Sequence, residues 1–221
     1  MEIDLLYMRD HIPLFVKSAI ITLQIAFLGI FFSLLVGVIN NCIYFFKLKT
    51  LSFVVRIYVE LSRNTPLLVQ LFFLYFALPT LGIKLSSFST AVIGLTFLGG
   101  SYITETFRSG MEAVSNGQVE AGLSIGLSRV QILRYVIVPQ AITISIPALI
   151  ANGIFLLKET SVVSAIAVHE LLYATTSLIA IDYKTAEALI LLTLSYVIIF
   201  LPLSLILTLV ERRMKCGQYG N

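Results

Sequence analysis

Residues 120–141 read EAGLSIGLSRVQILRYVIVPQA, and this stretch, in a mostly polar insert between hydrophobic segments, decides the fold. Ser115 and Ser128 each precede a glutamine by three residues. This is the capping-box spacing, in which the two side chains bond each other's backbone N–H groups at a helix start. Gly126 can take the left-handed conformation that ends a helix. The pattern predicts a short helix near residues 118–125, a sharp turn, and a second helix after Ser128.

The composition is that of a membrane protein. The chain has 221 residues, of which 58% are hydrophobic and 12% charged, whereas soluble domains carry about 25% charged residues. Windows without Asp, Glu, Lys or Arg are long enough to cross a bilayer core as helices, in which every backbone group is satisfied internally. The alternating segments of about 10 residues that are typical of membrane β-barrels are not seen. We predict an all-α integral membrane protein with one domain, residues 1–221. Its five transmembrane helices lie near residues 15–46, 57–83, 86–110, 131–157 and 188–210, with a cytoplasmic loop at 111–130.

Basic residues set the predicted orientation. Five spans place the termini on opposite sides of the membrane. The side of the N-terminal arm carries five basic residues, and the other side carries ten. The positive-inside rule therefore places the N-terminus outside, and the C-terminus and the 111–130 loop in the cytoplasm. The net charge of +3 suits basic inner loops, and we infer no nucleic-acid partner from it.

The short helix near residues 118–125 has two possible roles. It contains no basic or aromatic residue, whereas helices that anchor at a lipid surface favour Lys, Arg and bulky apolar side chains. A docking surface for a protein partner and an ordinary structured loop both remain open on these residues. In the first span, Gly29, Ser33 and Gly37 form a small-xxx-small pattern that predicts close contact with another helix.

Two carboxylate–arginine pairs have helical spacing. Glu105 and Arg108, and likewise Glu60 and Arg63, lie three residues apart, so each pair can meet on one helix face as a structural ion pair. The two cysteines are far apart and form no CxxC pair, and His169-Glu170 does not continue into an HExxH motif. We expect no metal site.

The insert resembles the cytoplasmic EAA loop of ABC-transporter permeases. That pattern is EAA, three residues, Gly, nine residues, Ile, one residue and Leu-Pro. This chain matches the spacing throughout, with Gly122 in place of the second alanine and valines in place of Ile and Leu. The resemblance assigns ATPase coupling to six residues: Glu120, Ala121, Gly122, Gly126, Arg129 and Pro139.

Three further segments resemble the branch of these permeases that imports polar amino acids of the histidine, glutamine and arginine type. RNTPLLVQ at 63–70 is similar to its RGTPLLVQ segment. SYITETFRSG at 101–110 is similar to AYxxExFRGG, and LLKETS at 156–161 to LLKDSS. The resemblance implies the permease fold of type I ABC importers, with the 118–125 helix as the coupling helix.

The resemblance also implies the partners. Two ATPase subunits would bind the cytoplasmic face, a second permease subunit would complete the path, and an extracytoplasmic protein would deliver the amino acid. No lysine follows a glycine, so the chain has no GKS/GKT phosphate loop. We therefore expect no enzymatic activity and no cofactor in this chain, with ATP and Mg bound by the partner ATPase. The expected location, with membrane lipid around it, is the bacterial inner membrane.

Substrate contacts are predicted at the outer end of the fourth span. Lys158 and Glu159 can meet the carboxylate and ammonium of a zwitterion, because ionisable groups at membrane depth are functional candidates. They can equally anchor the helix end at the interface. The accompanying polar candidates are Asn152, Thr160, Ser161 and, in the second span, Gln70.

Other functions fit the sequence less well. An ABC permease for another small solute is the main alternative. A secondary transporter would more often show inverted repeats, and we find no internal repeat. An intramembrane protease has only Gly99-Gly100-Ser101 in its favour, with both histidines, His11 and His169, outside the charge-free windows. The sequence specifies neither the amino acid nor whether the second permease is identical.

Overall fold

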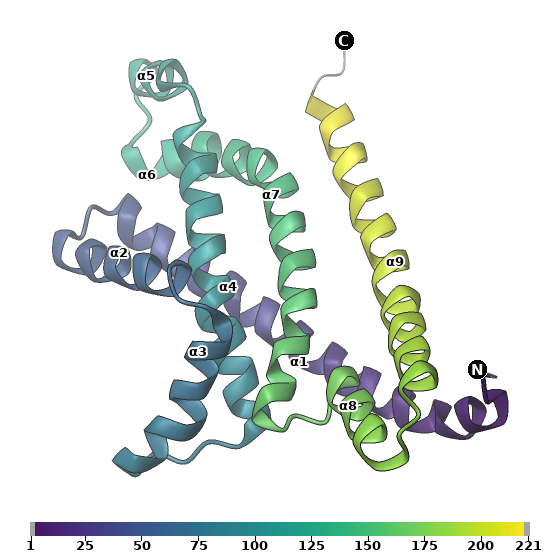
Figure 1. The fold of residues 1–221 in the computed structure, drawn as a ribbon. Coiled ribbons are helices and arrows are strands. Elements are labelled where there is room, and N and C mark those ends of the chain that lie inside the picture. Colours follow the sequence, from purple (N-terminus) through teal and green to yellow (C-terminus); the bar gives the residue numbers. More distant parts are fainter. Residues whose placement is uncertain (1–2, 219–221) are drawn as a thin grey trace.

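The computed structural model describes the backbone of residues 3–218 and the side chains of residues 3–209, and every regular element in this part is helical. Figure 1 shows long helices crossing the molecule, with the α5–α6 loop at one end. The elements are α1 (Leu5–Phe45), α2 (Lys49–Arg63), α3 (Leu67–Phe72), the π-helix η1 (Phe73–Ala77), the 3₁₀ helix η2 (Leu78–Leu81), α4 (Ser87–Glu112), α5 (Asn116–Ser124), α6 (Arg129–Ile132), the π-helix η3 (Leu133–Ile137), α7 (Val138–Glu159), the 3₁₀ helix η4 (Thr160–Ile166), α8 (Leu171–Asp182) and α9 (Thr185–Gln218).

Three helical segments of the described chain are long and apolar enough to cross a membrane: Leu5–Phe45, Arg129–Ile166 and Thr185–Leu209. A fourth span is obtained if α2 and the following Leu67–Leu81 segment are counted together. The prediction of an all-helical membrane protein is confirmed.

The predicted span 57–83 is not one continuous helix. α2 ends at Arg63, and the chain bends by 107° before the next helical segment. Pro66 explains the break, because proline lacks a backbone N–H and disfavours helical geometry in the residue before it. Gln70 holds the corner: its side-chain amide donates to the backbone oxygens of Ser62 at 3.0 Å and Thr65 at 3.1 Å.

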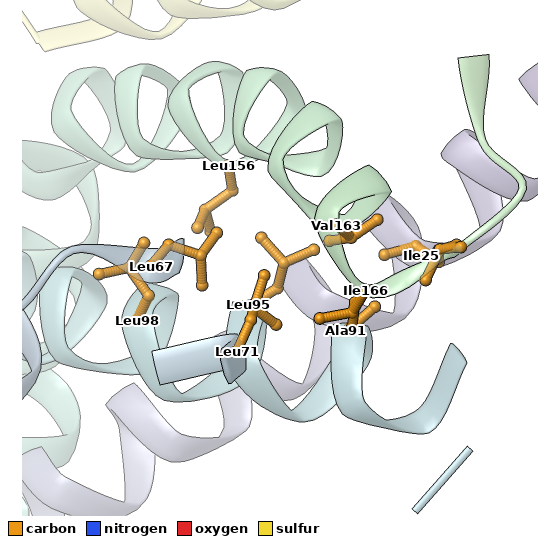
Figure 2. Packing of buried hydrophobic residues seen from close by; sticks show 10 residues of the cluster. Ile25, Leu67, Leu71, Ala91, Leu95, Leu98, Leu156, Val163 and Ile166 are labelled. Carbon is orange, nitrogen blue, oxygen red and sulfur yellow. The ribbon is translucent and has the colours of Figure 1, made fainter. Parts of the chain in front are cut away.

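The main core lies where α1, α3, α4 and α7 meet η4. Leu71, Leu95 and Leu156 are at most 1% exposed there and pack in one cluster, which Figure 2 shows together with Ile25 and Val163. This core fixes α4 between α1 and α7, its two most extensive neighbours.

The predicted small-residue face of α1 is confirmed, because Gly29, Ser33 and Gly37 are all buried. A Cβ on Gly29 would lie 2.9 Å from the Leu95 Cβ. The Ser33 hydroxyl donates to the Leu95 carbonyl at 3.3 Å. The small residues thus let α1 and α4 approach closely.

Candidate functional site

A polar cavity of about 420 Å³ lies between the end of α2, the C-terminal half of α4, and α7. Hydroxyl, amide and charged groups form part of its wall. They come from Arg63 on α2, from Tyr102, Glu105 and Thr106 on α4, and from Ser145 and Asn152 on α7.

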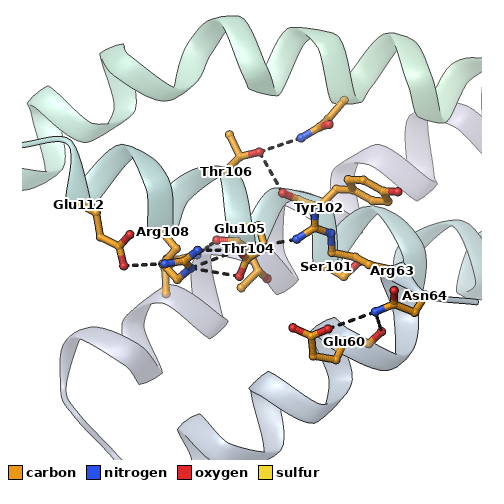
Figure 3. A network of polar contacts seen from close by, with 12 residues as sticks. Glu60, Arg63, Asn64, Ser101, Tyr102, Thr104, Glu105, Thr106, Arg108 and Glu112 are labelled. Carbon is orange, nitrogen blue, oxygen red and sulfur yellow. Dashed lines mark hydrogen bonds and ion pairs between the residues drawn. The ribbon is translucent and has the colours of Figure 1, made fainter.

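Arg63 supplies the cavity with a cation that is only loosely engaged. Its guanidinium lies 3.7 Å from the Glu105 carboxylate and 5.4 Å from the centre of the Tyr102 ring, and the side chain is 43% exposed. Both distances exceed a hydrogen bond, so the five N–H donors of the guanidinium stay available to a ligand. Figure 3 shows Arg63 facing α4 from the end of α2.

The structure corrects the predicted contact between Glu60 and Arg63. Glu60 instead accepts a hydrogen bond from the Asn64 side chain at 3.1 Å. Arg63 lies at the end of α2 and turns toward Glu105 and Tyr102, where a carboxylate and an aromatic face both attract it.

Glu105 is held by a second arginine. The Arg108 guanidinium donates to both Glu105 carboxylate oxygens, at 2.8 and 3.1 Å, in the bidentate geometry typical of strong ion pairs. Arg108 also donates to Glu112 at 2.6 Å. Glu105 thus has its charge matched by Arg108, which leaves Arg63 as the partly free cation of the cavity.

Asn152 joins α7 to α4 inside the same cavity. Its side-chain N–H donates to the Thr106 hydroxyl at 2.8 Å. That hydroxyl donates to the Tyr102 carbonyl at 2.9 Å, as Figure 3 shows. Within the described residues the Asn152 side-chain oxygen accepts no hydrogen bond, so it can receive a donor from a ligand. Gly110 permits the helix approach, because a Cβ there would lie 2.8 Å from the Ala141 carbonyl oxygen.

Of the six predicted substrate contacts, only Asn152 lines this cavity. Lys158 and Glu159 end α7, and the cavity wall does not include them. Thr160 and Ser161 donate to the backbone oxygens of Leu157 and Lys158, at 2.7 and 3.0 Å. Buried Gln70 holds the α2–α3 corner, as described above.

Sequence reasoning did not single out Tyr102, Thr106 or Ser145. The helical spacing of Tyr102, Glu105 and Thr106, three and four residues apart on one apolar helix, is the signal that marks a shared polar face.

Glu170, which sequence reasoning also left without a role, is a fully buried carboxylate between η4 and α8. It caps α8 by accepting the Tyr173 backbone N–H at 2.7 Å, and the Tyr196 hydroxyl donates to it at 3.3 Å. Burial raises the pKa of Glu170 to about 7, since a charged carboxylate loses its hydration there. Among the residues that the structure describes, His, Cys, Asp and Glu form no group of three or more that could hold a metal.

The insert adopts the predicted helix, turn and helix. Ser128 and Gln131 form both halves of a capping box, at 3.3 and 2.8 Å, and Gly126 has φ 83°. Ser115 also caps α5, but its hydroxyl accepts from the Gly117 N–H, so the predicted capping box between Ser115 and Gln118 is not formed. Gly122 is buried, and a Cβ there would lie 3.0 Å from the Ile132 side chain. The departure from alanine therefore lets α5 pack tightly on α6.

The loop presents an uncovered surface. Leu123 and Ile125 are 53% and 78% exposed, and Glu120 and Arg129 are also exposed. In Figure 1, α5 lies at the end of the molecule toward which α9 runs at its C-terminus. Pro139 is the second residue of α7 and directly follows the π-helix η3, where the helical hydrogen-bond pattern changes.

The protein is an all-helical membrane protein with a polar cavity between its helices and a structured loop at one end. These features are typical of a transport permease. The chain belongs to the family of binding-protein-dependent transport system inner membrane components, whose model matches residues 29–215. It is therefore an amino-acid ABC transporter permease, a multi-pass membrane component without enzymatic activity.

The chain is similar to known permeases over most of its length. The glutamine transport system permease protein GlnP of Escherichia coli (strain K12) is 35% identical over 97% of this chain and 99% of its own length. The probable glutamine ABC transporter permease protein GlnP of Bacillus subtilis (strain 168) is 36% identical, over 76% of this chain and 77% of its own. A crystal structure of an amino acid ABC transporter with histidines matches with a TM-score of 0.90 and 35% identity, covering 96% of this chain and 100% of that one.

Proposed function

We propose that the chain is the translocation subunit of an importer for a polar amino acid, and that the amino acid passes through the cavity at Arg63. The observation that carries this proposal is the loosely engaged guanidinium beside the Asn152 amide, between helices of a membrane protein. Guanidinium groups bind carboxylates bidentately, and polar groups at membrane depth mark transport paths. Arg63 would take the α-carboxylate and Asn152 a polar side chain.

The proposed topology has five spans within a single domain, residues 1–221, and the type I importer permease fold. The spans are α1, the bent α2–α3 segment, α4, α6 with α7, and α9. α4 has 26 residues, or about 39 Å at 1.5 Å per residue, which exceeds the roughly 30 Å of a bilayer core. The basic-residue imbalance supports an outer N-terminus and a cytoplasmic C-terminus.

The loop at residues 111–130 is proposed to bind the ATPase. Two exposed apolar side chains, Leu123 and Ile125, lie there beside the exposed charges of Glu120 and Arg129, which suits a protein partner. The complete transporter would contain two ATPase subunits that hold ATP and Mg, a second permease, and an extracytoplasmic amino-acid-binding protein. α5 would be the coupling helix, and Glu120, Ala121, Gly122, Gly126, Arg129 and Pro139 would form or support the contact.

Glutamine is the proposed substrate to test first. Two of the relatives above are named for glutamine, and its side-chain amide can both donate to and accept from Asn152. Lys158, Glu159, Thr160 and Ser161 remain candidates for a second contact near the outer end of α7, and Gln70 remains a weaker one. The alternative is a permease for another small solute.

The test is uptake by the complete transporter. The chain is reconstituted in vesicles with its ATPase and binding protein, and ATP-dependent accumulation of labelled glutamine is compared with that of arginine, histidine and a sugar. Glutamine uptake that stops without ATP supports the proposal, whereas accumulation of the sugar alone contradicts it. Glu120→Arg should release the ATPase during purification, and retention with normal ATP turnover would remove the loop from the contact.

A further inference from the structure

Two adjoining cavities lie at the end of α1, away from the polar cavity. The first, about 410 Å³, lies between the α1–α2 turn and the α5–α6 loop, and Phe45, Lys47, Leu123 and Arg129 are among its walls. The second, about 190 Å³, lies between α1, α4 and the start of α7. Phe45 is part of the wall of both, so the two lie next to each other.

The two cavities differ in chemistry. The first has Lys47 and Arg129 at its rim, both exposed. Among the side chains of residues 3–209, neither cation has an acidic partner within 4 Å. The walls of the second cavity are almost entirely apolar, with Val38 and Phe107 among them. A ligand that fills both would therefore carry an anionic group at one end and a hydrocarbon chain at the other.

Lys47 has a backbone conformation that favours glycine. Its φ is 51°, in the left-handed region that residues other than glycine rarely adopt. The residue turns the chain out of α1, and its N–H donates to the Tyr44 carbonyl at 3.1 Å. A glycine would make the same turn without strain, so a lysine at this position points to a use for its side chain.

The second cavity extends along α1, from Phe45 beside the first cavity to Val38, between α1, α4 and the start of α7. From Phe45 back to Val38 there are seven residues of α1, or about 10 Å at 1.5 Å per residue. The π-helix η3 borders both cavities, through Ile137 in the first and Leu133 in the second. Such π-bulges often occur at functional sites.

We propose that these two cavities bind one anionic phospholipid, with its phosphate between Lys47 and Arg129 and one acyl chain between α1, α4 and α7. Basic pockets among transmembrane helices bind anionic headgroups. A soluble partner protein can cover the first cavity, but it has no group that fills an apolar slot among spanning helices. Since the first cavity touches α1, α5 and α6, the bound lipid would help to hold the loop against the membrane domain.

The test uses the full chain, purified in detergent and stripped of lipid. Native mass spectrometry measures the binding of phosphatidylglycerol and, as the neutral probe, phosphatidylcholine. We expect one tightly bound phosphatidylglycerol per chain. Each cation near an anionic surface is worth about 1 kcal/mol, or roughly fivefold in affinity. Lys47→Asn, which suits the left-handed backbone but removes the charge, should weaken binding about fivefold, and Lys47→Arg should keep it.

Lys49→Gln is the matched control. Lys49 begins α2 two residues away and does not line either cavity, so its loss should leave phosphatidylglycerol binding within twofold. The proposal would be overturned if the two lipids bound equally, or if Lys47→Asn and Lys49→Gln lost phosphatidylglycerol affinity to the same extent. Either result would indicate attraction to the general surface charge and not to a specific site. Displacement of the lipid by glycerol phosphate would overturn it as well, because it would indicate a site for a soluble anion.

Cys42 reports on the acyl slot, because it is exposed and lines the second cavity. In a Cys216→Ser chain, bound phosphatidylglycerol should slow the reaction of Cys42 with N-ethylmaleimide by several-fold. An unchanged rate would contradict the acyl-chain placement. The same measurement on the assembled transporter should give the same protection, and lipid loss on assembly would assign the groove to a protein partner instead.

Discussion

Replacing Arg63 separates its role in transport from its role in folding. Arg63→Gln removes the guanidinium but keeps a side chain of similar reach. If Arg63 binds the substrate carboxylate, its loss removes hydrogen bonds to a charged group, worth about 1.5–3 kcal/mol. At 1.4 kcal/mol per tenfold, this corresponds to an increase of roughly 10- to 140-fold in the substrate concentration for half-maximal uptake.

The stability cost should be much smaller. The contact of Arg63 with Glu105 is 3.7 Å long and the arginine side chain is 43% exposed, and ion pairs of this kind contribute about 0–1 kcal/mol. The contact with the Tyr102 ring adds about 0.5–1 kcal/mol. Glu105 keeps its pair with Arg108 at 2.8 Å, so the substitution leaves no unpaired carboxylate. Arg63→Gln should therefore assemble into the transporter normally.

The assay is ATP-driven uptake of labelled glutamine by proteoliposomes over a range of substrate concentrations, with thermal unfolding measured on the same preparations. Arg56→Gln is the matched control, because Arg56 is exposed on the same helix but lines a neighbouring cavity with Glu60 and Arg108. Arg63→Lys keeps the positive charge but cannot bind a carboxylate bidentately. Its substrate concentration for half-maximal uptake should therefore lie between those of the unsubstituted chain and Arg63→Gln. Uptake by Arg63→Gln within twofold of the unsubstituted chain, or an equal defect in Arg56→Gln, would refute the assignment.

Three further substitutions test other parts of the proposal. Glu159→Gln should reduce uptake without affecting assembly, and unchanged uptake would remove Glu159 from the path. Gly126→Val should destabilise the α5–α6 turn by about 1–2 kcal/mol, because φ is 83° there and valine would be strained, although it would meet no clash. It should also weaken retention of the ATPase more than Gly126→Asn does. Equal retention in the two variants would contradict this. With its pKa raised to about 7, Glu170 holds its proton more tightly in the folded state, so stability should fall as the pH rises from about 4.5 to 7, by up to about 3 kcal/mol. Glu170→Gln should flatten that dependence in thermal unfolding between pH 5 and 8, and an unchanged slope would assign it to other groups.

The elements that local chemistry specifies could be predicted from the sequence. The turn at Gly126 and the capping box at Ser128 depend on residues within one or two helical turns, and the structure has both. The prediction of one continuous span at 57–83 was wrong at the break between α2 and α3, because hydropathy contains no information about backbone geometry. Pro66 explains why the helix breaks, but the 107° change of direction depends on the packing of α2 and α3 on α4.

The cavity shows why side-chain partners were harder to predict than helices. The i, i+3 spacing predicts a contact between Glu60 and Arg63. Spacing along one helix cannot show that another helix offers Arg63 a more favourable partner. Arg63 reaches Glu105 and Tyr102 only because the corner at Pro66 brings the end of α2 against α4. The same spacing does describe Glu105 and Arg108, which lie on one uninterrupted helix.

α4 is the element that relates the cavity to the loop. It carries Tyr102, Glu105 and Thr106 at the cavity and ends at Glu112, and α5 begins at Asn116 after only three residues. From Tyr102 to Glu112 the helix advances about 15 Å at 1.5 Å per residue, and the ion pairs of Arg108 with Glu105 and Glu112 brace this segment. A movement of α5 imposed by an ATPase would therefore reach the cavity through a short connection and a rigid helix. Because Glu105 also lies beside Arg63, a rigid-body shift of α4 changes the distance between these two groups, and with it the availability of the guanidinium to a substrate.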